Sequence, residues 1–138
     1  MFTNSIKQLA VLFVLGVICS TALLLATPAA QHPTVTRKML LKVDSAIPGY
    51  EQAYVAVEIP VGGREGRHTH PGSVMIYVQE GTLTFDCEGK PTATYKPGDT
   101  VYVEPEKIHE GINNGNTPIK VLASFLLKKG LPMTSQVQ

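Results

Sequence analysis

Cysteine and excess charge are both scarce in this chain of 138 residues. One of the two cysteines, Cys19, lies in an N-terminal apolar run, so removal of that run would leave Cys87 alone and exclude an internal disulfide. The formal net charge is only +1 at pH 7. The sequence has no basic stripe, so we expect no nucleic acid among its partners. Internal repeats and low-complexity tracts are also absent.

Charged residues are missing from residues 9–26, LAVLFVLGVICSTALLLA. Lys7 precedes this run and small residues around Ala30 follow it, an order typical of an export signal. A retained membrane anchor needs about 20 apolar residues, and this run is near that length but is interrupted by Gly16. We therefore expect residues 1–30 to be a signal peptide, with a membrane anchor as the less favoured alternative. The folded part is then periplasmic or secreted, and only an uncleaved N-terminal segment would contact a membrane.

A helical period is missing after the apolar run, and short β-type segments separated by Gly and Pro turns take its place. Residues 30–37 read as a linker. Residues 82–88, TLTFDCE, place Leu83, Phe85 and Cys87 on one strand face, which makes Cys87 a buried core thiol. Further strands are expected at residues 53–61, 73–79, 92–95, 100–104 and 119–127. This pattern predicts an all-β fold, a β-sandwich or small jelly-roll barrel.

Histidine is rare as well, and two of the four histidines, His68 and His70, are separated by one residue. Side chains alternate faces along a strand, so an extended His-x-His directs both imidazoles to the same side. A third metal ligand must come from another segment, and the candidates are His32, His109 and scattered carboxylates. His32 lies at the edge of the N-terminal segment, whereas His109 follows a Pro-containing loop at a strand start. Solvated or hydrogen-bonded histidines at turns are the alternative.

The spacing around these histidines resembles the two sequence motifs of the cupin superfamily. The matching positions are Gly62, His68, His70 and Gly81 in the first motif, and Gly98, His109 and Asn113 in the second. The resemblance implies a single cupin jelly-roll β-barrel over residues 35–130, followed by a C-terminal tail at 131–138. It also implies a divalent transition metal (Fe, Zn, Ni or Cu) on His68, His70 and His109, with Asn113 as a structural turn residue. Pairing through exposed strand edges, by the same analogy, predicts a homodimer.

Three positions depart from the cupin motifs. Val74 stands where the family has a metal-binding glutamate, and Glu104 and Glu106 replace a proline and a glycine. The two glutamates are expected to change only the shape of a loop. Val74 changes the chemistry, because three neutral imidazoles leave a divalent ion with its full charge. We expect weaker metal binding, a more acidic bound water and more open coordination positions.

An apolar interior is expected around the histidines, because strand parity places valines and an isoleucine on their side: Val74, Ile76, Val78, Val101 and Val103. Tyr77 then points outward, and Arg64 and Arg67 are taken as solvated. The favoured function is a metal-dependent, dioxygenase-like oxidoreductase on a small apolar substrate. The alternative is a non-catalytic module that binds or senses a small ligand or a metal, and a metal-independent isomerase is a weaker third.

Overall fold

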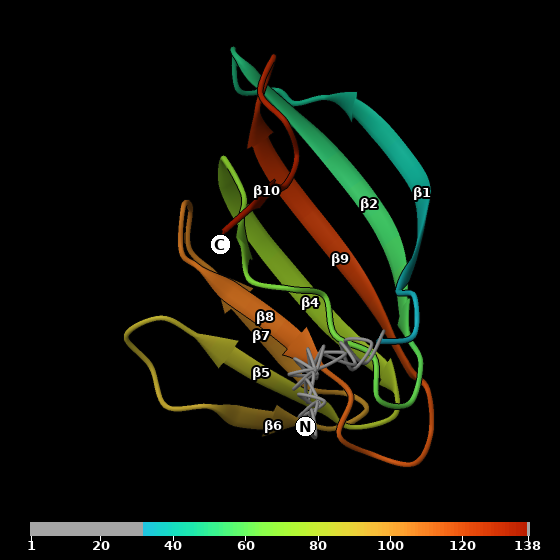
Figure 1. Cartoon of the computed structure of the whole chain (residues 1–138). Coiled ribbons are helices and arrows are strands. Elements are labelled where there is room, and N and C mark those ends of the chain that lie inside the picture. The colour runs from blue at the N-terminus through green and yellow to red at the C-terminus, as the bar shows by residue number, and fades with distance from the viewer. Residues whose placement is uncertain (1–31, 138) are drawn as a thin grey trace, which may run out of the picture.

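Two antiparallel β-sheets make up the described part of the chain, residues 32–137 of the computed structural model (Figure 1). The expected signal peptide or anchor at residues 1–30 lies outside this range. The larger sheet has the order β1 (Thr36–Asp44), β2 (Tyr50–Ile59), β9 (Ile119–Lys128), β4 (Gly72–Glu80) and β7 (Thr100–Val103). The smaller sheet has the order β10 (Ser135–Gln136), β3 (His68–Thr69), β8 (His109–Ile112), β5 (Leu83–Cys87) and β6 (Ala93–Tyr95).

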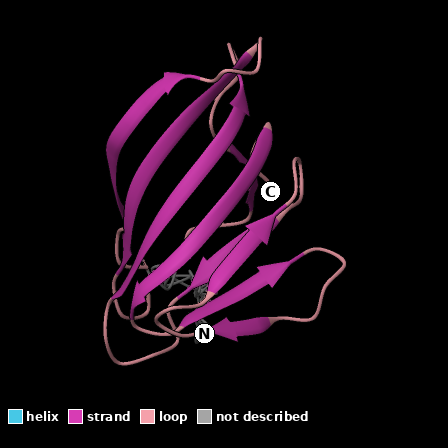
Figure 2. Ribbon diagram, turned by 180° about the vertical axis from the view of Figure 1, so that it is seen from behind, coloured by secondary structure: helices cyan, strands magenta, loops and turns pink. Residues whose placement is uncertain are grey.

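All elements of the described range are strands, as Figure 2 shows, and the expectation of an all-β fold is confirmed. Between residues 32 and 137 there is no helix with the length and hydropathy needed to span a membrane. The arrangement of two facing sheets is that of a jelly roll.

The core lies between the two sheets and follows the predicted alternation of side chains. Every second residue of β4 from Gly72 to Val78 is buried, and so is every second residue of β9. The five residues expected to line the interior are all buried, and so is Cys87. Tyr77 is 46% exposed, which confirms its outward orientation. The period-two alternation therefore predicted the inner faces correctly, because only one face of each strand meets the core.

Strand β1 differs from expectation. The sequence suggested a linker up to residue 37 and no strand over the next residues, yet Thr36–Asp44 pairs antiparallel with β2. All nine residues of β1 are exposed, and the register shifts between Met39 and Leu41. An edge strand with a bulge and two exposed faces has no alternation of apolar and polar residues, so the pattern that reveals inner strands is absent here.

The loop between β7 and β8 carries the two glutamates that depart from the family motif. Glu106 has a φ of 60°, the left-handed conformation that a glycine would adopt without strain. Its backbone N–H donates to the carbonyl oxygen of His70 at 3.0 Å. The loop thus keeps the shape that the motif glycine would allow, and it attaches directly to the segment that carries two of the histidines.

Candidate metal centre

Three histidines from two neighbouring strands of the smaller sheet meet in the interior. His68 on β3 lies opposite His109 at the start of β8 in the antiparallel register, and His70 follows β3 directly. The His68 and His109 ring centroids are 4.3 Å apart, and His70 lies 4.8 Å and 5.0 Å from them. One ligand nitrogen from each ring falls within 4.8 Å of the other two. The three rings are buried and close enough to share one ion.

A backbone carbonyl holds the Nδ1 atom of each ring. His68 Nδ1 lies 2.7 Å from the oxygen of Gly66, and His109 Nδ1 lies 2.8 Å from that of Lys107. His70 Nδ1 lies 2.6 Å from the oxygen of Met133. A carbonyl oxygen can only accept, so each Nδ1 must carry a proton, and in the neutral ring the lone pair then lies on Nε2. This outer shell of carbonyls fixes the tautomer that a metal ligand requires.

The charged form of the rings is disfavoured by their surroundings. Burial lowers the pKa of His70 to about 4, against the favourable hydrogen bond to Met133 and with a further lowering by the neighbouring His68 and His109. Burial likewise lowers the pKa of His109 to about 4. Both imidazoles are therefore neutral at pH 7, and no proton has to be displaced from either before a cation binds.

The cavity that the histidines face is small and mostly apolar, with a volume of about 50 Å³. The edge of His70 packs against the Phe125 ring at a centroid distance of 5.1 Å. Val74, which replaces the family glutamate, lies in the cavity wall and is 1% exposed. The apolar part of the wall comes from β2, β4 and β9: Val55, Val57, Val74, Ile76, Val121, Ala123 and Phe125.

Four further cavity residues had no signal in the sequence analysis. Arg37 and Glu65 line the cavity and form an ion pair, with Arg37 Nη2 donating to Glu65 Oε1 at 3.1 Å. Met133 and Thr134, from the segment expected to be a C-terminal tail, line it too. The next two residues form β10, which pairs with β3. A backbone acceptor such as the Met133 carbonyl leaves no trace in residue types, and Arg37 belongs to the strand that the pattern did not reveal.

The other residues considered from the sequence lie outside the histidine cluster. Asn113 is 1% exposed, and its Nδ2 donates to the carbonyl oxygens of Ile59 and Thr117, both at 2.9 Å, which agrees with a turn residue. His32 is exposed, with Nδ1 3.2 Å from the carbonyl oxygen of Gly62, and is outside the cluster. Arg64 was expected to be solvated.

The Arg64 side chain is 44% exposed, so it is solvated as expected, but it also forms an ion pair. Its Nε donates to Glu110 Oε1 at 3.0 Å, and a second bond joins Nη2 to Oε2. Glu110 is 3% exposed, and its hydrogen bonds to Arg64 hold the pKa of the carboxyl below its usual range. Arg67 pairs with Asp86 at 3.2 Å. Both arginines form their ion pairs on the outer side of the smaller sheet. Glu110 and Asp86 point there because they alternate with the inward-facing residues of β8 and β5.

Comparison with known proteins agrees with the geometry. The cupin domain family matches residues 55–125, about half of the chain, including all three histidines. The chain is a cupin. Over 77 residues it is 35% identical to the uncharacterized protein MJ1618 of Methanocaldococcus jannaschii, covering 54% of this cupin and 59% of that protein. This cupin therefore spans less than two thirds of that relative's length.

Solved structures show the same fold. A cupin-like protein from Thermotoga maritima superposes with a TM-score of 0.63 at 23% identity, covering 75% of each chain. The DMSP lyase DddQ from Ruegeria pomeroyi superposes with a TM-score of 0.57 at 22% identity, covering 62% of this cupin and 43% of the lyase. At such identities the likeness concerns the fold, and the chemistry must be argued from the site itself.

A divalent transition ion fits the donors present. Three imidazoles that can each offer an Nε2 lone pair suit Zn²⁺, Fe²⁺, Ni²⁺ or Cu²⁺, all of which accept nitrogen ligands. His68, His70 and His109 would hold the ion, and the apolar wall supplies no further donor at position 74. An ion with three protein ligands keeps coordination positions open, which is the arrangement of catalytic rather than closed structural sites.

Proposed function

We propose that this cupin is a metal-dependent enzyme that acts on a small, largely apolar substrate, with a dioxygenase-like oxidation as its reaction. The observation that carries the proposal is the set of three imidazoles whose Nδ1 atoms are all held by backbone carbonyls. Such an arrangement presents three Nε2 lone pairs to one point without any carboxylate at position 74. When bound, a redox-active ion would supply open positions for substrate and reactivity toward dioxygen.

The residues of the chain perform the remaining tasks. The valine, isoleucine and phenylalanine side chains of the wall exclude water and favour the apolar body of a substrate. The carbonyls of Gly66, Lys107 and Met133 keep the three rings oriented. Glu65 is the one carboxylate among the described cavity residues and is the candidate to accept a proton from a bound substrate.

A non-catalytic binding module is the second candidate, favoured by the small volume of the cavity, about 50 Å³. Such a space accepts a few non-hydrogen atoms, enough for a bound anion or a small ligand on the metal. In both cases we propose an exported protein, on the strength of the uncharged run at residues 9–26 after Lys7. Sequencing the N-terminus of the protein recovered from the periplasm or medium tests this, because a retained Met1 would contradict cleavage.

Elemental analysis of the purified protein tests the metal centre. We expect one transition-metal ion per chain, and loss of nearly all of it in His109→Ala, since two ligands hold an ion poorly. His32→Ala is the matched control, because His32 is exposed and outside the cluster. Full metal content in His109→Ala would refute the three-ligand site.

Oxygen uptake separates the two candidate functions. The Fe²⁺-loaded protein is mixed with small diketones, thiols and phenols, and dioxygen consumption is followed with an electrode. Uptake that disappears in His109→Ala supports the enzyme. Saturable binding of the same compounds without uptake or product favours the binding module.

A further inference from the structure

The cavity beside the histidines contains one opposite-charge pair. Among the described residues, Arg37 and Glu65 are the only Arg, Lys, Asp or Glu side chains of the wall. Arg37 lies opposite the buried Val57 in the register of β1 and β2, so its side chain points to the inner face. Its positive charge also contributes to lowering the pKa of His70.

A divalent ion would leave this cavity strongly positive. Imidazoles that ligate an ion are neutral and Val74 supplies no charge, while Arg37 and Glu65 cancel each other. The charge of the ion would therefore remain uncompensated by protein. In a largely apolar space such a charge is expensive unless an anion accompanies it. The ligand that best satisfies this site carries a negative charge of its own.

The Arg37 guanidinium is available to a ligand. The described residues give it one hydrogen bond, from Nη2 to Glu65, although it has five N–H donors. Its side chain is 44% exposed, so the ion pair with Glu65 is screened by solvent and contributes little to stability. A ligand carboxylate can therefore bind the remaining face of the fork, or replace Glu65, with little loss of stability.

We propose that the ligand of this cupin is a small organic acid whose carboxylate binds Arg37 and whose apolar body of a few carbon atoms lies along the valine wall. This inference rests on the proposed function and names its substrate class. The cavity volume limits the body to a few carbons. Glu65 then serves as the resident anion that holds Arg37 in place until the substrate arrives.

Calorimetric titration of the Zn²⁺-loaded full-length chain with acetate, propionate and butanoate tests the inference, with propionamide as the neutral isostere of propionate. We expect binding of the acids and little binding of the amide. Arg37→Gln should weaken propionate binding about ten- to hundredfold, and Arg37→Lys less, because a charged hydrogen bond is lost or replaced. Arg67→Gln is the matched control, since Arg67 is equally exposed at 46% and pairs with Asp86.

Equal affinity for propionate and propionamide, or an unchanged affinity in Arg37→Gln, would overturn the inference. Metal content is measured on the same samples, so the two proposals fail separately. If the protein contains one metal ion per chain but does not bind the acids, the anion site is refuted and the metal centre is still supported. Absence of metal in the wild-type protein sinks the proposed function, whereas Arg37-dependent binding of propionate to that metal-free protein would still support the anion site.

A second observation concerns the side of the larger sheet that faces away from the core. Antiparallel sheets with one solvated face are normally polar there. Here Met75, Tyr77 and Tyr102 are 56%, 46% and 55% exposed on β4 and β7. With apolar side chains of β1, β2 and the turn between them they form what we name the outer face: Leu41, Val43, Ile47, Tyr54, Met75, Tyr77 and Tyr102.

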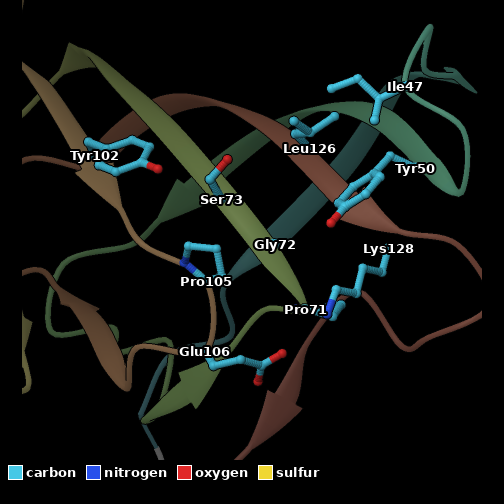
Figure 3. Close-up of a pocket in the computed structure, with 10 residues that line it drawn as sticks. All are labelled: Ile47, Tyr50, Pro71, Gly72, Ser73, Tyr102, Pro105, Glu106, Leu126 and Lys128. Atoms are coloured by element: carbon cyan, nitrogen blue, oxygen red, sulfur yellow. The ribbon is translucent and has the colours of Figure 1, made fainter.

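A groove of about 350 Å³ lies at one end of the outer face (Figure 3). Tyr102 and Tyr50 line it from β7 and β2, with Leu126 of β9 between them. Lys128 and Glu106 lie at the end of this groove, and Lys120 and Glu80 form an ion pair at the opposite end of the sheet. The outer face thus has an apolar centre, with charges of both signs at each end.

We infer that a second copy of this chain covers the outer face. From their exposed fractions, the seven residues leave roughly 700 Å² of surface open. A standard interface buries about 800 Å² on each partner, so one isologous contact suffices. The centre has no charged side chain among the described residues, and both ends carry both signs, so a two-fold arrangement meets no block of like charge. The proposed contact is face to face and differs from the strand-edge pairing that the family resemblance implied.

Light scattering on the full-length protein over a wide concentration range tests this. We expect a dimer mass for the wild type and a monomer mass for Met75→Glu and Tyr102→Glu, because each places a charge in the apolar part of the contact. Thr94→Glu, at an exposed position of β6 on the other sheet, is the control and should stay dimeric. A monomeric wild type, or a dimer that survives both outer-face substitutions, would overturn the inference.

Discussion

Acidification of the metal-free protein should destabilise it strongly between pH 6.5 and 4. His70 and His109 have pKa values of about 4 in the folded chain, lowered by burial. An unfolded histidine has a pKa near 6.5. In the window between these values the unfolded chain binds two protons that the folded chain does not bind. The free energy of unfolding therefore rises with pH across the window. The stability that the two neutral histidines contribute is fully present above pH 6.5 and is lost as the pH falls toward 4.

The magnitude follows from the size of the two shifts. One pKa unit corresponds to about 1.4 kcal/mol. At pH 5 each imidazole has then lost roughly 2 kcal/mol of its contribution relative to pH 8, and the pair roughly 4 kcal/mol. Domains of this size have an unfolding free energy of about 5–15 kcal/mol, so the loss is a large fraction of the total.

Urea denaturation of the chelator-treated protein at pH 8 and pH 5, followed by circular dichroism, measures the loss. His70→Gln should reduce the pH-dependent part by about half, since one of the two shifted groups is gone. His32→Gln should leave it unchanged, because His32 is exposed and lies outside the cluster. A free energy of unfolding that is equal at both pH values, or a pH dependence that survives in His70→Gln undiminished, would refute the reasoning.

Three further substitutions test the metal site, the turn at Asn113 and the loop at Glu106. Val74→Glu should lower the metal dissociation constant roughly tenfold or more in chelator competition, because it restores an anionic ligand; unchanged affinity would mean that residue 74 does not reach the ion. Asn113→Ala should cost about 2–4 kcal/mol in urea denaturation, because the buried carbonyls of Ile59 and Thr117 lose their donor; a smaller loss would contradict the hydrogen-bonded turn. Glu106→Gly should raise stability by about 0.5–1 kcal/mol through relief of the left-handed φ, with Glu106→Ala unchanged as control.

The inner strands and the cluster of three histidines could be predicted from sequence because both depend on local spacing. Alternation in β4 and β5 reports burial on one side, and His68 and His70 share a side for the same geometric reason. His109 could be placed at a strand start by its turn residues and by the second cupin motif. The fit of Val74 into the cavity wall follows from the same parity.

The remaining features depend on long-range contacts that residue types do not encode. Strand β1 is exposed on both sides, so its sequence shows no period, and the inward orientation of Arg37 could not be foreseen. Glu110 gave no sign of burial until the structure placed Arg64 beside it, 46 positions away in the chain. The carbonyl of Met133 is a backbone atom and is invisible in sequence.

Strand β10 has a consequence for how quickly the proposed metal centre would exchange an ion. It consists of two exposed residues paired only with β3, and the Met133 carbonyl just before it orients the His70 ring. Detachment of so short an element breaks few contacts and requires far less free energy than unfolding of the sheets. Release and uptake of metal would therefore occur at the rate at which β10 detaches from β3. This two-residue strand, which supplies no ligand, would then determine how long the ion stays bound.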